Sequence, residues 1–588
     1  MSVRLTAREA IALVTDRFEE LPYPERESGP DGPLGWQGYD ASRARAAERT
    51  GEEESVVCGT ASVEGTRAVL IAFEFGFLGG SLGQRTGDRL EAAYVHARAH
   101  RLPVVPLVAT GGSRMQEGML ALTQLQRVAR QSALTREAGL PQIAVLRDPT
   151  TGGGWATLGA GADVTLALPG VQVGFAGSRV RPPDADPTAY TAEAQVAAGS
   201  ADAVVPPGEL RGVLGRWLRL LAPGSPTRAP LPDTTRAPLP DTTWAPLRDT
   251  PATPGSPLPT PGPPGQDPAA PSPAGPHAQD RAAPSPTGPH APDPTTPSPI
   301  GPPGQDRAAP SPAGPHAPDP ATPSPAGPHA PDPATPSSTG PHAPDPATPS
   351  PIGPPPPDQG ALPAPPPVAP APLPPALGTA DLPRTGWDAV QRARHPGRPR
   401  AEEYLDAYFT HRVALSGDRC GGSDPEGMLC GFGEHAGRTV AYAAQTGAAT
   451  RPAGYRTAAR LIRLADRLGI PVLTLVDTPG AANDAEAERQ GAGAAIADLF
   501  GAVAAARTPV TTLVIGEGGS GGALALAAPG NTWATPDSYF SVIAPELAAA
   551  ILKRTPAQVE PTADQLRVRP QDLVELGVAR GIASQDTP

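Results

Sequence analysis

Two stretches of the chain alternate short apolar runs with amphipathic ones, and a polar, proline-rich stretch separates them. The apolar runs predict strands at 55–63, 68–75, 104–108, 143–146, 164–168 and 171–175 in the first stretch, and at 427–434, 439–445 and 472–476 in the second. Helical periodicity is clearest over 454–468, and further helices are predicted at 6–20, up to residue 100, from 115, at 402–413 and from 491. Strands that alternate with helices predict an α/β fold in both stretches.

The separating stretch contains most of the 84 prolines among the 588 residues. It opens with an eight-residue repeat, RAPLPDTT, and continues with a 13-residue repeat around GPHAPDPATPSPA. Such a composition buries too little apolar surface to fold, so a disordered linker with polyproline II character is expected. The predicted organisation is an N-terminal extension at 1–50, an α/β domain at 51–222, the linker at 223–384 and a second α/β domain at 385–588.

A glycine-rich turn in the second stretch is the first sign of chemistry. The sequence VIGEGGSGGALALAAPG (514–530) predicts a strand, a turn with five glycines and a small-residue helix. The N–H groups at the start of a helix lack partners within the helix and point at whatever lies there. Taken alone, the turn fits a phosphate loop, an oxyanion hole or a tight packing turn.

The two stretches share one register, which indicates an internal duplication. Four landmarks recur at the same spacing: Pro103 and Pro471 (471 − 103 = 368), Thr110 and Thr478 (478 − 110 = 368), Pro141 and Pro509 (509 − 141 = 368), and Gly153-Gly154 and Gly521-Gly522 (521 − 153 = 368). The glycine turn of the second stretch therefore has a counterpart in the first.

Charge and composition exclude several classes of protein. The net charge of −12 argues against general nucleic-acid binding. Cys58, Cys420 and Cys430 form no CxxC pair, so neither a zinc site nor a disulfide framework is indicated. No signal peptide and no apolar run long enough to cross a membrane is recognisable, which favours a cytoplasmic protein. Lys553 is the single lysine in the chain.

The glycine turns and their duplication resemble the crotonase superfamily, in which such turns hold a thioester enolate. The first stretch resembles the β subunit of bacterial acetyl-CoA carboxylase carboxyltransferase through FEFGFLGGSLG (73–83), ATGGSRMQEG (109–118), GLPQIAVLRDPTTGG (139–153) and GFAG (174–177). The second resembles the α subunit through GYRTAARLIRLADRLGIPVLTLVDTPGA (454–481), VIGEGGSGGALALA (514–527) and YFSVIAPE (539–546). This resemblance implies a fused β–α carboxyltransferase of the actinobacterial type, with two crotonase-like (ββα-superhelix) domains.

The resemblance also implies a reaction and a set of site residues. Such enzymes move a carboxyl group from carboxybiotin to an acyl-CoA, and backbone N–H donors stabilise the charge that develops. By resemblance, the enolate site comprises Gly111 and Gly112, helped by Gly153 and Gly154. The site for the biotin carbonyl comprises Gly521, Gly522 and Ala523, with Gly480 bordering it. CoA is expected near Gly79, Gly80 and Ser81, and near Gly174 to Gly177.

The implied partners are separate proteins. Lys553 lies in ILKRT, unlike the sequence around a biotinylated lysine, so carboxybiotin is expected on a biotin carboxyl carrier protein rather than bound covalently here. No ATP-binding domain is recognisable, so biotin carboxylase is expected as another partner, and a homodimer or higher homo-oligomer is implied. Residues 1–50 lack the cysteines of the family's zinc ribbon, so no metal is expected.

Several alternatives stay open at the level of sequence. A malonyl-thioester decarboxylase and a non-catalytic assembly subunit are the competing functions. Glu117 and Glu517 fit either acid–base catalysis or helix capping, and Arg114 fits either a ligand anion or a structural ion pair. Asp477 fits a turn residue better than a base. Ala482-Asn483-Asp484 stands where the family has Tyr-Pro, on the side expected for biotin.

Overall fold

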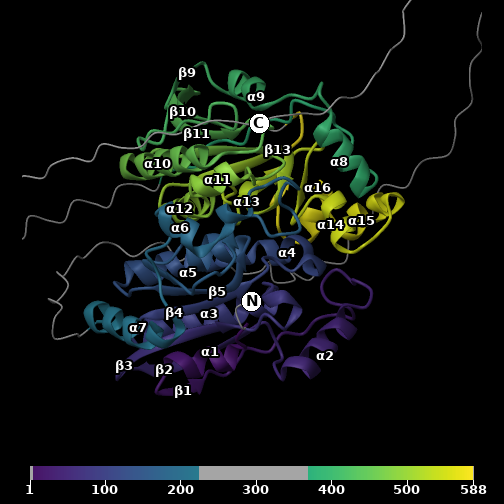
Figure 1. Ribbon diagram of the computed structural model, residues 1–588. Helices are drawn as coiled ribbons and strands as arrows, with labels where there is room; N and C mark the ends of the chain where they lie inside the picture. The colour runs from purple at the N-terminus through teal and green to yellow at the C-terminus, as the bar shows by residue number, and fades with distance from the viewer. Residues whose placement is uncertain (1–3, 224–367, 587–588) are drawn as a thin grey trace, which may run out of the picture. The chain divides into compact units, whose positions relative to one another are not determined.

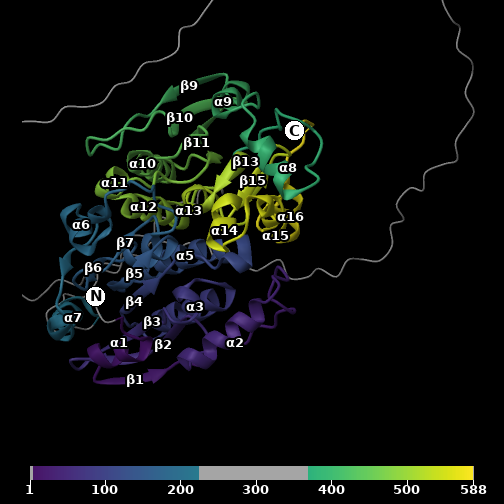
Figure 2. The same cartoon turned by 45° about the vertical axis from the view of Figure 1, so that its right-hand side comes forward.

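The computed structural model describes residues 4–223 and 368–586, which we call the first and second halves. The bulk of the predicted linker therefore lies outside the described residues. Both halves belong to one compact unit, and their elements are labelled in Figures 1 and 2.

The first half is built on a mixed sheet with strand order β1-β2-β3-β4-β5-β6-β8, with β7 beside β5. Its elements are α1 (Ala7–Val14), β1 (Arg17–Glu20), α2 (Tyr39–Thr50), β2 (Val56–Val63), β3 (Thr66–Phe73), η1 (Leu78–Gly80), α3 (Gln84–Ala99), β4 (Val104–Thr110), η2 (Met115–Glu117), α4 (Gly118–Leu122), α5 (Gln124–Glu137), β5 (Ile143–Thr151), η3 (Trp155–Gly159), β6 (Val164–Ala167), β7 (Val173–Gly174), η4 (Pro187–Tyr190), α6 (Ala192–Ala197), β8 (Ala203–Val204) and α7 (Pro207–Leu221). The pairs β1–β2 and β2–β3 are antiparallel, and the remaining pairs are parallel.

The second half repeats this plan with strand order β16-β14-β13-β12-β11-β10-β9 and β15 beside β13. Its elements are α8 (Gly386–Arg394), α9 (Ala401–Tyr408), β9 (His411–Ala414), β10 (Met428–His435), β11 (Arg438–Gln445), α10 (Pro452–Leu468), β12 (Val472–Thr478), α11 (Ala485–Arg489), α12 (Ala492–Ala505), β13 (Val510–Gly519), α13 (Ser520–Leu524), β14 (Thr532–Ala534), β15 (Tyr539–Ser541), α14 (Pro545–Ile551), η5 (Pro556–Gln558), α15 (Val559–Gln565), α16 (Pro570–Glu575) and β16 (Gly581–Ile582). The predicted class, two α/β domains, is confirmed.

The duplication extends to individual backbone pairings. Thr110 pairs with Thr150 after an irregularity in the β4–β5 register, and Thr478 pairs with Gly518 after the same irregularity in β12–β13. The isolated bridge Leu82–Ser113 recurs as Thr450–Ala481, again 368 residues later (450 − 82 = 368; 481 − 113 = 368). The shared spacing therefore reflects the same turn geometry in both halves.

Two predicted helices are wrong in part. The helix predicted at 6–20 ends at Val14, and Arg17–Glu20 forms an edge strand on β2. The helix predicted at 402–413 ends at Tyr408, and His411–Ala414 pairs with β10. In both segments a neighbouring strand offers backbone partners, and this tertiary pairing outweighs the local helical pattern.

Residues 368–384, which the sequence assigns to the linker, pack against the second half. Ala371 and Ala376 are 3% exposed. The carbonyl of Ala371 accepts a hydrogen bond from Thr511 Oγ1 (2.9 Å), and the Ala376 N–H donates to the Ser584 carbonyl (3.0 Å). A proline-rich segment can thus be fixed by backbone hydrogen bonds without forming a helix or strand.

The halves meet through their helices. In both views α5 of the first half lies beside α12 of the second (Figures 1 and 2). One cluster of buried apolar side chains runs through both halves and includes Leu125, Trp155, Ile496 and Leu499. Gln126 Nε2 also donates to the Ala527 carbonyl at 2.8 Å. The interface therefore brings α5 next to the glycine-rich turn that precedes Ala527.

Candidate active site

The glycine-rich turn of the second half presents free N–H donors. β13 runs into α13, for which Gly519 is the N-cap. Gly521 and Gly522 lie in the first turn of the helix, and their N–H groups have no acceptor among the described residues. The hydrogen bond from the Ala523 N–H to the Gly519 carbonyl, which a regular helix would make, is also absent among the described residues. All three residues predicted here thus offer a donor.

Gly522 has no room for a side chain. A Cβ on it would lie 2.5 Å from the Ala481 nitrogen and 2.6 Å from the Tyr455 hydroxyl oxygen. A Cβ on Gly519 would lie 2.0 Å from the Pro479 carbonyl oxygen. The turn after β13 therefore packs directly on the Pro479–Ala481 turn after β12, which contains Gly480.

In the first half, the two predicted glycine pairs differ in their hydrogen bonding. The Gly111 N–H donates to the Gly79 carbonyl (2.9 Å), and the Gly112 N–H donates to Thr110 Oγ1 (3.0 Å). The N–H groups of Gly153 and Gly154, at the start of the next helical turn, have no acceptor among the described residues. The available donors of the first half are therefore those of Gly153 and Gly154.

The two glycine turns lie against the same side chain of the first half. Leu125, on α5, lies against both turns: its Cδ1 would be 2.3 Å from a Cβ on Gly153 and 3.5 Å from a Cβ on Gly521. Phe175 also lies 3.5 Å from a Cβ on Gly521. Leu125 thus brings the two turns, which come from opposite halves, close to each other.

The remaining predicted residues surround the first-half turn. Gly80 packs on the Ala109 carbonyl, where a Cβ would lie 2.1 Å away, and Ser81 Oγ accepts a hydrogen bond from Arg114 Nε (3.1 Å). The Gly174 carbonyl accepts the Gly152 N–H (3.2 Å), and a Cβ on Gly177 would lie 3.6 Å from Thr151 Oγ1. The segments containing Gly79–Ser81 and Gly174–Gly177 therefore hold the ends of β4 and β5.

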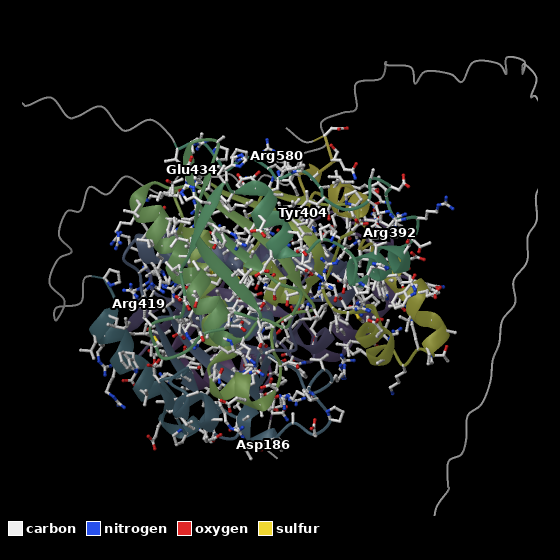
Figure 3. The ribbon with its side chains drawn as sticks, turned by 90° about the horizontal axis from the view of Figure 1, so that it is seen from above. Asp186, Arg392, Tyr404, Arg419, Glu434 and Arg580 are labelled. Carbon is white, nitrogen blue, oxygen red and sulfur yellow. The ribbon has the colours of Figure 1, made fainter. Side chains whose placement is uncertain are left out.

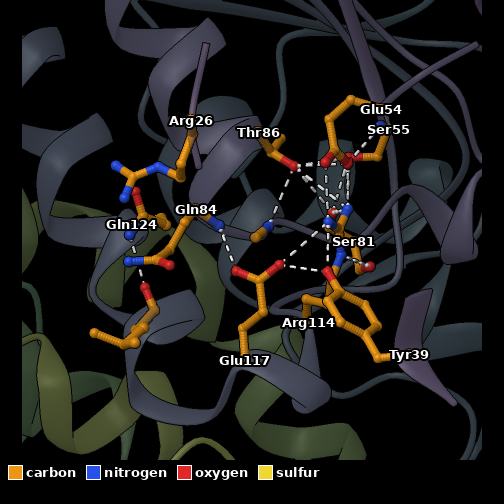
Figure 4. Close-up of polar contacts among 12 residues, drawn as sticks. Arg26, Tyr39, Glu54, Ser55, Ser81, Gln84, Thr86, Arg114, Glu117 and Gln124 are labelled. Carbon is orange, nitrogen blue, oxygen red and sulfur yellow. Dashed lines mark hydrogen bonds and ion pairs between the residues drawn. The ribbon is translucent and has the colours of Figure 1, made fainter. Parts of the chain in front are cut away.

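Arg114 forms a buried ion pair, as its structural alternative predicts (Figure 4). It is 1% exposed, and its guanidinium donates to Glu54 (2.5 Å) and to the Ser81 carbonyl (2.7 Å). Burial by itself raises the pKa of Glu54, but the charge and hydrogen bonds of Arg114 outweigh it and bring that pKa down to about 2. Glu117 accepts from the Gln84 N–H (2.6 Å) at the start of α3, which is capping.

The second half has a comparable buried pair beneath its turn. Asp477 is fully buried, and its carboxylate accepts from Arg398 (2.5 Å) and Arg400 (3.2 Å). Glu517 accepts from Arg394 Nε (2.8 Å) and from the Tyr539 hydroxyl (2.8 Å). Both carboxylates are therefore held as ion-pair partners, and backbone donors remain the candidate groups for chemistry.

The sequence did not predict the polar side chains that lie behind the second-half turn. Gln445 Nε2 donates to the Gly522 carbonyl at 3.3 Å, and the fully buried Tyr455 hydroxyl lies against Gly522. The first-half equivalent of Tyr455 is Gly87 (455 − 368 = 87), where the Gln124 side chain fills the space. The motif GYRTAA contains Tyr455, but only the tertiary packing of α10 shows what its hydroxyl touches. The two turns thus share a backbone and differ in what lies behind it.

No group of three or more His, Cys, Asp or Glu side chains within 4–223 and 368–586 is placed to hold a metal ion. Among those residues, no helix is long and apolar enough to cross a membrane.

Comparisons with known proteins agree on both halves. The carboxyl transferase domain family matches residues 36–200, and the acetyl co-enzyme A carboxylase carboxyltransferase-like family matches 382–586. The fused carboxyl transferase subunits beta/alpha of acetyl-coenzyme A carboxylase from Salinispora arenicola are 32% identical over 606 residues, covering 100% of this chain and 83% of that protein. The separate beta subunit of Leuconostoc citreum is 46% identical over 177 residues (30% of this chain, 62% of that protein). The alpha subunit of Methylobacterium sp. (strain 4-46) is 43% identical over 215 residues (34% and 68%).

Proposed function

Because the chain belongs to the acetyl-CoA carboxylase carboxyltransferase family, with β-like and α-like parts fused in one chain, we propose that its two opposed glycine turns are the oxyanion holes of the transfer reaction. The observation that carries this proposal is that free N–H groups occur in both halves, at Gly153-Gly154 and at Gly521-Gly522, on turns that both lie against Leu125. Donors fixed by a folded backbone suit charge that develops only during the reaction.

Carboxybiotin, on a carrier protein, supplies the carboxyl group in this proposal. The N–H groups of Gly521 and Gly522 bind the ureido oxygen, which becomes negative as the N–C bond to the carboxyl group breaks. The N–H groups of Gly153 and Gly154 bind the thioester oxygen of the acyl-CoA while the α-carbon loses its proton to the ureido nitrogen. The α-carbon then forms the new C–C bond to the carbon of the carboxyl group that the ureido nitrogen released. Each donor of this kind is typically worth about 10²–10³ in rate.

The other predicted residues support these donors. Gly111 and Gly112 use their N–H groups to fix the loop around the first turn, and Gly480 forms the surface on which the second turn packs. The glycines and Ser81 in the segments 79–81 and 174–177 are proposed to border CoA. Ala523, the third residue of this turn, is proposed to donate its N–H to the biotin site as well.

The test is reconstitution of the whole reaction. The full chain, a biotin carboxyl carrier protein and a biotin carboxylase are incubated with ATP, bicarbonate and a panel of acyl-CoA thioesters, and the carboxylated product is quantified. Malonyl-CoA formation that requires the carrier is the expected result. Decarboxylation of a malonyl thioester without biotin, or inactivity with every acyl-CoA, would contradict the proposal.

A further inference from the structure

One segment of the second half binds the first half through hydrogen bonds and an ion pair. This segment, 482–490, contains α11 and follows the Pro479–Ala481 turn. Asn483 Nδ2 donates to the Val180 carbonyl (2.9 Å), and the Tyr190 hydroxyl donates to the Asn483 carbonyl (2.8 Å). Arg489 forms an ion pair with Asp186, which lies at the rim of the molecule in Figure 3.

Glu488 is the buried member of this segment. Glu488 is 0% exposed, and its Oε1 accepts a hydrogen bond from the Ala176 N–H (3.0 Å). Its Oε2 has no hydrogen-bond partner among the described residues. A carboxylate buried at an interface without a full set of partners costs stability, so its presence calls for another explanation than stability alone.

The backbone that Glu488 holds leads directly to the first-half donors. Ala176 follows β7, which pairs with the end of β5 at Thr151 and Gly174. The Gly174 carbonyl accepts the N–H of Gly152, the residue immediately before Gly153 and Gly154. Two hydrogen bonds thus connect a carboxylate of the second half with the donor turn of the first.

Gly174 is shaped for this contact. A Cβ on Gly174 would lie 3.2 Å from Glu488 Oε1 and 2.9 Å from Tyr190 Cδ1. The Glu488 carboxylate therefore packs against the backbone of Gly174, where a side chain would crowd it. The space that a side chain on residue 174 would need is taken by Glu488 and Tyr190.

The charges around Glu488 come from both halves. Arg181 donates from Nε to the Ala176 carbonyl (2.9 Å) and lies over the Tyr190 ring, 3.8 Å from its centre. Burial is the main cause that raises the pKa of Glu488 to about 7; the negative charge of Asp484 raises it further, and the Ala176 N–H and Arg181 oppose the rise. The hydrogen bond to Ala176 needs an acceptor oxygen, which both a carboxylate and an amide provide.

We propose that Glu488 is a positioning residue through which the second half fixes the donor turn Gly152–Gly154 of the first half. The acyl-CoA site is then complete only while the two halves are paired. This inference rests on the proposed function, since it concerns the turn assigned to the thioester oxygen.

The experiment compares Glu488→Ala and Glu488→Gln in the full chain, with Glu486→Ala, an exposed residue of the same helix, as the matched control. Each is assayed for carrier-dependent acyl-CoA carboxylation, with kcat and KM for the acyl-CoA determined per folded enzyme. We expect Glu488→Ala to lower kcat by about 10–100-fold, because a displacement of about 1 Å can cost 10²-fold. Glu488→Gln keeps an acceptor oxygen and should restore kcat to within about threefold of wild type, as should Glu486→Ala.

Two outcomes overturn the inference: Glu488→Ala retaining wild-type kcat, whether or not its melting temperature falls, or Glu488→Gln failing as fully as Glu488→Ala. If Glu488→Ala does not fold, Glu488→Asp decides, because its carboxylate is one methylene shorter and no longer reaches the Ala176 N–H. A fall in kcat then supports the inference and an unchanged kcat refutes it. An inactive wild type would instead refute the proposed function, so the two failures are distinguishable.

Discussion

Replacing Gly522 with alanine tests the proposed biotin-side hole. The new Cβ would lie 2.5 Å from the Ala481 nitrogen, 2.6 Å from the Tyr455 hydroxyl and 3.1 Å from the Gly480 carbonyl carbon. Two of these neighbours are backbone atoms, which cannot rotate aside. An ordinary contact begins at 3.4 Å, so the turn has to retreat by 3.4 − 2.5 = 0.9 Å.

The size of the effect follows from this displacement. Oxyanion donors act at about 2.7–3.1 Å, and a shift of 0.9 Å moves them to about 3.6–4.0 Å, outside hydrogen-bond range. Loss of one donor lowers kcat by about 10²–10³-fold, equal to about 2.7–4 kcal/mol of transition-state stabilisation. Overpacking the core should also lower the free energy of unfolding by about 1–3 kcal/mol.

The assay is carrier-dependent malonyl-CoA formation, measured with thermal unfolding of the same samples. Because the lost interaction is made only in the transition state, kcat should fall while KM for acetyl-CoA stays unchanged. Gly501→Ala is the control, since no atom lies within 4 Å of its added Cβ. A folded Gly522→Ala enzyme with kcat within tenfold of wild type would refute the assignment of this turn.

Two further predictions concern stability. Arg114→Met leaves Glu54 buried without its cation, so the free energy of unfolding at pH 7 should fall by about 3–5 kcal/mol in a denaturant titration. In the folded protein the pKa of Glu54 is about 2, below its ordinary 4.5. The contribution of the ion pair to the free energy of unfolding is therefore complete above about pH 4.5 and is lost as the pH falls toward 2. If the difference in free energy of unfolding between Arg114→Met and wild type does not narrow over this range, the ion-pair account is contradicted. Deleting residues 230–360 should leave the melting temperature unchanged. Deleting 230–380 also removes the buried Ala371 and Ala376, so it should lower the melting temperature. Equal melting temperatures for the two deletions would show that the contacts of 368–380 do not stabilise the fold.

Much of the fold was predictable because its signals are local. Prolines before strands and glycines after them mark the same turns in both halves, and their spacing identified the duplication that the strand register confirms. The edge strands β1 and β9 were missed because their helical pattern is overridden by a neighbouring strand.

The candidate site was predictable as a pair of turns but not in its details. Sequence cannot show that Gly79 already accepts the N–H of Gly111, because the two lie on different loops. Nor can it pair Arg114 with Glu54 or Glu488 with Ala176, which meet only after folding. Contacts between distant residues decide which donors remain free, and no local pattern encodes them.

The apolar core that both halves share has a consequence for assembly. Separate subunits bind in proportion to their concentrations, whereas two domains of one chain meet at an effective concentration that dilution does not change. A fused chain also delivers its two kinds of domain in a fixed one-to-one stoichiometry. If the two parts were made from separate genes, unequal synthesis would leave the part in excess with an unpaired apolar surface. In a fused chain the two parts are always made in equal amounts.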